Sequence, residues 1–153
     1  MLVLLLFANW DSSLAQNIHP CPYFPAKRAA FHATLGKDPT PNSPIHFNLP
    51  EQLGAGFDTA TGIYTAPYSG WYTFEFQLFP RATALVNVDL IRNGGLVARA
   101  RCDDEPDYST CSSGITLHVN EGDKIWLQTN FGGPYNMAYF DNIFSGVLVI
   151  PDP

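Results

Sequence analysis

The residues best suited to bind a metal ion lie between two cysteines, Cys102 and Cys111. Calcium and other hard cations bind through several oxygen ligands, which carboxylates and backbone carbonyls supply. This short segment carries four acidic side chains within five positions: Asp103, Asp104, Glu105 and Asp107. The acidic loop at 103–107 is therefore the best candidate for a calcium site. The alternative is a solvated acidic loop that adds only solubility.

The cysteines themselves predict a disulfide in an oxidising compartment. A bond between Cys102 and Cys111 would close the acidic loop and stabilise the fold by roughly 3 kcal/mol through loop entropy. The third cysteine, Cys21, is then left for an intermolecular bridge or a free thiol. A zinc site is disfavoured, because the sequence has no C-x-x-C pair and His19 beside Cys21 lacks further ligands at a suitable spacing.

Aromatic residues in these loops are the other candidates for ligand contact. A glycine-rich segment at 129–138 carries Phe131 and Tyr135, which would stack on sugar rings; an ordinary surface connector is the alternative. With Glu105 and Tyr108 of the acidic segment, they are the candidate ligand-binding residues. The sequence has no G-x-S-x-G, phosphate-binding, dinucleotide-binding or H-E-x-x-H motif, so we do not expect an enzyme.

The composition describes the scaffold that must position these loops. Of the 153 residues, 46% are hydrophobic and 14% aromatic, which favours a single β-rich domain with a substantial core. The net charge is −6, and the eight basic residues form no stripe. Nucleic acid and anionic membranes are therefore not expected as partners.

A two-residue alternation between residues 72 and 78 identifies the central strand of this scaffold. It directs one set of side chains to the core (Tyr72, Phe74, Phe76, Leu78) and another set away from it (Thr73, Glu75, Gln77). A similar alternation at 84–91 places Asn87 and Asp89 opposite the apolar face, and Asn93-Gly94 predicts a tight hairpin turn. Further strands are predicted at 29–35, 45–49, 63–66, 96–100, 113–119, 124–128 and 142–150. About ten short strands without helical periodicity predict an all-β sandwich or jelly roll.

The start of the chain differs from this periodic region. Residues 2–8 are apolar but too few to span a bilayer, and small residues fit cleavage after Ala15. We therefore expect a signal peptide at 1–15, a proline-rich leader at 16–25 and secretion. A buried N-terminal strand is the alternative for the first segment. No other segment is apolar enough to cross a membrane, so membrane insertion is not expected.

Five sequence blocks, in order, resemble the globular head of complement C1q. They are Ala30-Phe31 with I-H-F at 45–47; Phe57-Asp58 with T-G-I-Y-T-A-P at 61–67 and S-G-W-Y-T-F-E-F at 69–76; L-I-R-N-G at 90–94; E-G-D-K-I-W-L at 121–127; and F-S-G-V-L at 144–148. The resemblance covers residues 26–150 and leaves 151–153 as a C-terminal tail. It implies a ten-stranded jelly roll, shared with tumour necrosis factor ligands, that assembles as a compact trimer.

The resemblance also implies a function. Members of this family are secreted, non-catalytic binding modules, and a short form without a collagen stalk is associated with lectin-like pattern recognition in innate immunity. The partners would be microbial polysaccharide or lipopolysaccharide, or a cell-surface receptor, together with further copies of the chain itself in a homotrimer. A receptor-binding signalling ligand and an extracellular matrix component are the alternative functions.

Some heads of this family bind calcium near the trimer axis through the loop that matches residues 102–111. Asp103 falls at an aspartate-ligand position, and Asp104 falls where a backbone carbonyl contributes. Thr110 stands where calcium-binding members have Gln or Asp, a departure for which Asp107 would compensate. Cys102 matches a cysteine of the complement chains, whereas its pairing with Cys111 is predicted from this sequence alone.

Overall fold

The strands of the protein form two antiparallel sheets. The computed structural model describes residues 27–81, 86–102, 109–130, 136–137 and 142–153. The first sheet has the order β2 (Phe47–Leu53), β1 (Ala30–Leu35), β12 (Ile143–Pro151), β5 (Gly70–Leu78) and β9 (Cys111–Val119). The second has the order β3 (Phe57–Asp58), β4 (Ile63–Thr65), β10 (Lys124–Thr129), β7 (Val86–Arg92) and β8 (Gly95–Cys102). Two short strands, β6 (Pro80–Arg81) and β11 (Asn136–Met137), pair as a separate ribbon.

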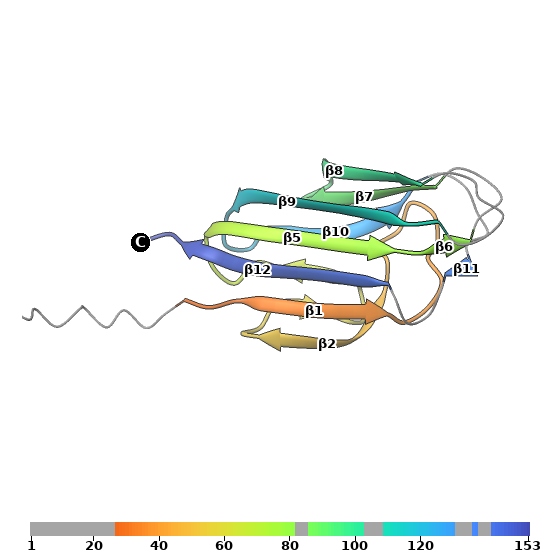
Figure 1. The fold of residues 1–153 in the computed structure, drawn as a ribbon. Coiled ribbons are helices and arrows are strands. Elements are labelled where there is room, and N and C mark those ends of the chain that lie inside the picture. The colour runs from red at the N-terminus through yellow and green to blue at the C-terminus, as the bar shows by residue number, and fades with distance from the viewer. Residues whose placement is uncertain (1–26, 82–85, 103–108, 131–135, 138–141) are drawn as a thin grey trace, which may run out of the picture.

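Two five-stranded sheets confirm the predicted all-β fold of ten main strands. Each sheet also joins strands from distant parts of the chain, as in a jelly roll; β1, for example, pairs with the last strand, β12. Figure 1 shows the first sheet as one layer of strands, with the start of β1 and the end of β12 at the same end of the layer. Among the described residues, no helix is long and apolar enough to span a bilayer.

Strand β5 is an inner strand of the first sheet, next to the middle strand β12. It pairs with β12 on one side, where Phe74 lies opposite Gly146, and with β9 on the other, where Phe74 lies opposite Ile115. Its side chains alternate as predicted, and the core-facing set is buried: Tyr72, Phe74, Phe76 and Leu78. Leu78 of β5 and Cys111 of β9 are opposite each other at the end of this ladder.

Aromatic rings fill the space between the two sheets. Phe31 of β1 is at the centre of this cluster, with its ring centroid 4.5 Å from that of Tyr64 and 4.9 Å from that of Phe144. Tyr72 and Phe74 stack on each other with centroids 5.8 Å apart. Such aromatic pairs stabilise the fold by more than the area they bury would alone. The aromatic residues of the sequence therefore contribute strongly to the stability of the core.

Two turns hold the strands in this arrangement. Asn93 and Gly94 join β7 to β8 with φ values of 51° and 85°, the left-handed conformation that a tight hairpin needs. Gly62 precedes β4 with a φ of 74°, and a Cβ there would lie 2.1 Å from the carbonyl oxygen of Ile45. Gly62 is therefore required for two reasons, conformation and close backbone contact.

The strand predicted at 45–49 differs from the observed one. Residue Pro44 bridges to Gln128, and the backbone N–H of Ile45 donates to the carbonyl of Leu127, so this part belongs beside the second sheet. Beyond His46 the chain joins the first sheet as β2, which continues to Leu53. A strand through Pro50 is possible because β2 is at the sheet edge, where a missing N–H is tolerated.

Candidate functional site on the outward face of the first sheet

The first sheet has a second face that points away from the core, which we call the outer face. Apolar side chains are exposed along it: Trp71 (48%), Val147 (44%), Leu53 (55%) and Ile150 (60%). They occupy two adjacent rows across the strands, because Trp71 pairs with Ile150, and Ala30 pairs with both Val147 and Leu53. Scattered exposed apolar residues are normal, but residues aligned in rows indicate an interaction surface.

One end of the outer face is held by a small polar network. Trp71 meets the ring of His118 edge-on at 5.7 Å, and the His118 Nε2 lies 3.0 Å from both carboxylate oxygens of Asp152. Lys27 Nζ donates to the backbone carbonyl of Asp152 at 2.8 Å. The residues after β12 are therefore tied to β9 and to the segment before β1.

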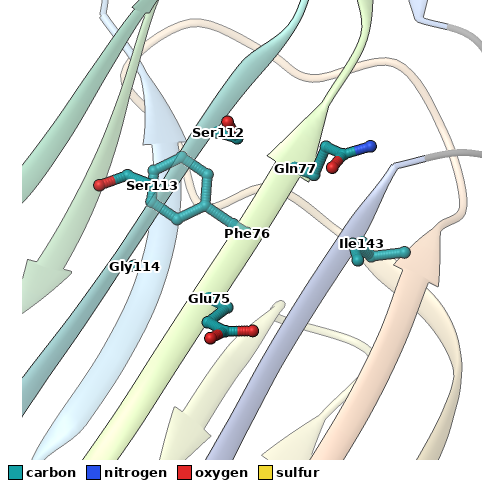
Figure 2. Close-up of a pocket in the computed structure, with 7 residues that line it drawn as sticks. All are labelled: Glu75, Phe76, Gln77, Ser112, Ser113, Gly114 and Ile143. Carbon is teal, nitrogen blue, oxygen red and sulfur yellow. The ribbon is translucent and has the colours of Figure 1, made fainter.

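The middle of the outer face is polar and uneven. Thr73 and Thr116 share a hydrogen bond of 2.8 Å between their hydroxyls, and Glu75 lies opposite Gly114 in the β5–β9 ladder. A hollow of about 320 Å³ opens beside Glu75, and Figure 2 shows the residues around it: Glu75, Phe76 and Gln77 of β5, Ser112, Ser113 and Gly114 of β9, and Ile143 of β12. A second hollow, of about 220 Å³, involves Glu75 on the side of Ser145 and Val147.

The second sheet carries a different polar group on its own outward face. Asp89 of β7 is only 2% exposed, and it accepts two hydrogen bonds from Arg99 of β8, at 2.5 and 2.8 Å. Asn130 also donates its side-chain amide to Asp89. The alternation at 84–91 therefore placed Asp89 and Asn87 on the correct face, but both are buried rather than exposed.

The predicted disulfide is present and links the two sheets. Cys102 ends β8 in the second sheet and Cys111 begins β9 in the first, with their Cα atoms 5.2 Å apart. Both residues are buried and belong to the hydrophobic core. The acidic loop between them is thus closed at its base by a covalent bond.

Most of the predicted site residues lie outside the described part of the chain. These are the candidate calcium ligands Asp103, Asp104 and Asp107, and the candidate ligand-binding residues Glu105, Tyr108, Phe131 and Tyr135. The predicted signal peptide at 1–15, the predicted leader at 16–25 and Cys21 lie outside it as well. Thr110 is described and exposed, one residue before the disulfide. In the described ranges, no three His, Cys, Asp or Glu side chains gather as metal ligands.

The sequence reasoning missed the outer face as a surface of interest. The signal was available in the alternation of the central strands, because Trp71 and Val147 are apolar at positions that point away from the core. Apolar residues on both faces of a central strand predict that both faces are covered in the working protein.

Solved structures define the class of this fold. The globular domain of zebrafish complement 1qA protein superposes with a TM-score of 0.70 at 22% identity, over 80% of this chain and 98% of that one. The Eiger TNF from S. frugiperda superposes with a TM-score of 0.65 at 14% identity, over 82% and 93% of the two chains. The fold is therefore the jelly roll common to C1q and TNF proteins.

The sequence comparison gives the family within this class. The sequence model of the C1q domain matches residues 30–149, and the chain belongs to the C1q domain family. Caprin-2 of Danio rerio is 33% identical over 131 residues, which are 82% of this chain and 14% of that protein. Complement C1q and tumor necrosis factor-related protein 9A of Homo sapiens is 29% identical over 127 residues, 78% of this chain and 37% of that protein. The chain thus spans well under half the length of these two relatives.

Proposed function

We propose that this chain is a secreted, non-catalytic recognition module that works as a homotrimer and binds repetitive ligands, microbial surface glycans first among them. The observation that carries the proposal is the apolar outer face of the first sheet, with Trp71, Val147 and Ile150 in adjacent rows. Burying these side chains between copies stabilises an assembly, at roughly 25 cal/mol per Å² of apolar area. The Cys102–Cys111 disulfide supports an extracellular location, because such bonds persist in oxidising compartments.

The proposed mechanism is avidity. A closed trimer presents three identical sites in a fixed geometry, and a microbial surface presents the same glycan many times. Once one site is bound, the other two meet their ligands at a high effective concentration, so weak single contacts combine into strong attachment. This mechanism requires no catalytic group and only weak affinity of each site for an isolated sugar.

The test compares two aspartate substitutions on opposite sheets. Val147→Asp places a charge on the outer face, and Leu96→Asp places the same charge at a similarly exposed position of β8 in the second sheet. We expect light scattering to give a trimer for the native chain and for Leu96→Asp, and a monomer for Val147→Asp. Binding to bacterial and fungal surface polysaccharide should follow the trimer.

Two results would contradict the proposal in different ways. A native chain that is monomeric at micromolar concentration removes the trimer. A trimer that binds no microbial surface or glycan array removes the recognition function, and then favours the alternative below.

Calcium is proposed as a ligand of the acidic loop. The donor set of Asp103, Asp104 and Asp107 fits a hard cation, and the Cys102–Cys111 disulfide closes the segment of sequence that contains them. We expect glycan binding to fall on chelation and to return with added calcium. The double substitution Asp103→Ala and Asp104→Ala should remove the chelator-sensitive part, and indifference to both treatments would exclude the metal.

A receptor-binding signalling ligand is the second candidate. It is favoured by the fold shared with Eiger TNF and by the relation to complement C1q and tumor necrosis factor-related protein 9A. Saturable binding of the native trimer to cells, without binding to glycan arrays, would support this function over pattern recognition.

A further inference from the structure

Glu75 is a carboxylate on the outer face, one row from Thr73 and Val147. It projects from β5, the strand between β12 and β9, and its cross-strand neighbours are Ser145 and Gly114. Both hollows described above for this region include Glu75 in their lining. Any copy of the chain that covers the apolar rows of Trp71 and Val147 will also cover this carboxylate or lie close to it.

The charged and titratable groups around Glu75 offer it no nearby cation within the described residues. On β5 the other titratable side chain is Tyr72, which is buried in the core, and β12 has none. On β9 there are the disulfide-bonded Cys111 and His118, which lies opposite Trp71 and is paired with Asp152. On β1, beyond Ser145 in the same row, is His32. On β2, beyond His32, is Glu51, a second carboxylate.

Covering Glu75 in its ionised form is therefore unfavourable. A carboxylate that leaves water without a cation or strong donors opposite it shifts toward the neutral acid, and like charges from neighbouring copies shift it further. Glu75 lines the hollow at Gly114, and Ser112, which is on the same face of β9, lines it too.

We propose that Glu75 makes self-association through the outer face pH-sensitive, so that the trimer tightens in mild acid and loosens as the pH rises. The inference rests on the proposed trimer and adds a means of regulating it. Its sign follows from linkage: if association takes up protons, the association constant increases as the pH falls. Each proton taken up changes that constant by about tenfold per pH unit.

The experiment measures the trimer dissociation constant by sedimentation equilibrium between pH 5 and pH 8. Glu75→Gln removes the titrating group and keeps its shape. Glu121→Gln removes the same charge from the exposed turn that follows β9, outside the row of Glu75, and so controls for the net charge of the chain. Circular dichroism at each pH verifies that all three proteins remain folded.

We expect the native chain and Glu121→Gln to dissociate at least about tenfold more readily per pH unit on going from acid to alkali. Glu75→Gln should form a trimer whose dissociation constant varies much less with pH and equals the acid value of the native chain. A trimer with no pH dependence, or a dependence unchanged by Glu75→Gln, overturns the inference and leaves the trimer intact. A native chain that is monomeric throughout the range overturns the trimer and the inference together.

Discussion

Asp89 lies on the outward face of the second sheet and requires specific hydrogen-bond donors. Its carboxylate is almost fully buried, and its partners come from the neighbouring strand β8 and from Asn130 beyond β10. A buried carboxylate that keeps its charge needs several donors, and Arg99 supplies two of them. The Asp89–Arg99 pair thereby connects β7 and β8 on the outside of the second sheet.

Substitution of Arg99 tests this account. Arg99→Ala leaves the buried carboxylate with only its remaining donor, so we expect a clear loss of melting temperature. Arg101→Ala is the matched control, because Arg101 is an exposed arginine two residues along the same strand. Equal and small effects of the two substitutions, measured by thermal unfolding, would mean that the pair contributes nothing beyond an ordinary surface contact.

Asp123 predicts a pH dependence of stability. Partial burial works to raise its pKa, but hydrogen bonds from the Asn93 side chain at 2.7 Å and the Asn120 N–H at 3.0 Å, with the nearby charge of Arg92, hold the pKa below the usual value. A lowered folded-state pKa adds stability at pH values above about 4, and that stability is lost as the pH falls through the lowered value. Carboxyl chemical shifts followed by NMR will give this pKa directly.

Removing the Asn93 side chain is the complementary measurement. Asn93→Ala takes away one donor to Asp123 and also the acceptor for the backbone N–H of Lys124. We expect the Asp123 titration to move up toward the ordinary range and unfolding by urea to depend less on pH below about 4. An unchanged Asp123 titration in this variant would rule out the hydrogen bond as the cause.

At the scale of the strands, the packing of β12 depends on a missing side chain. Gly146 faces the core, where a Cβ would lie 2.5 Å from Phe31 Cε1 and 2.8 Å from Phe74 Cδ1. Both rings belong to the central aromatic cluster, so they have little freedom to move. Because Gly146 has no side chain, the rings of Phe31 and Phe74 can pack directly against the backbone of β12.

Two glycine-to-alanine substitutions distinguish this packing role from a general effect of glycine. Gly146→Ala should lower the free energy of unfolding by about 1–3 kcal/mol through overpacking. Gly114→Ala is the control on β9, where a Cβ would make an ordinary 3.4 Å contact with Glu75 Cγ. Denaturant unfolding should place Gly114→Ala within about 0.5 kcal/mol of the native chain. Similar losses in both would refute the clash at Gly146.

The strands show how far sequence patterns predict this fold. The predictions of the β5 alternation and of the turn at Asn93-Gly94 were both correct, because each depends only on residues that are neighbours in the sequence. The extent of β2 was not predicted, since it depends on where the chain leaves the second sheet at Pro44 and Ile45. The burial of Asp89 depended on Arg99, a partner that no periodicity identifies.

The candidate site was less predictable than the fold, because it too depends on contacts between residues that are distant in the sequence. The Cys102–Cys111 disulfide could be predicted from spacing, and the structure confirms it. The loop residues from Asp103 to Tyr108 were chosen by residue type, and their roles remain predictions. The outer face was overlooked because its residues come from five strands, and only the sheet order β2-β1-β12-β5-β9 assembles them.

At the scale of the whole molecule, the proposed trimer makes stability depend on concentration. Assembly through the outer face stabilises the folded chain by mass action, so the melting temperature should rise with protein concentration. We expect this rise for the native chain over a hundredfold range of about 1–100 μM, and no rise for Val147→Asp. Leu96→Asp should behave like the native chain, and a rise that persists in Val147→Asp would place the interface elsewhere.

The antiparallel pairing of β1 with β12 has a practical consequence for how the protein is handled. Lys27 contacts the backbone of Asp152 and Pro153, so the start of β1 and the end of β12 lie side by side at one end of the sandwich (Figure 1). The strand ends at Leu78, Cys102, Thr129 and Ile143 are at the other end, and the predicted ligand loops continue from them. A biotin or affinity tag attached at residue 27 or at residue 153 therefore anchors the sandwich to a sensor surface by the same end and leaves the opposite end facing the analyte. Joining residues 27 and 153 by a short linker would likewise permit a circular permutant with new termini elsewhere.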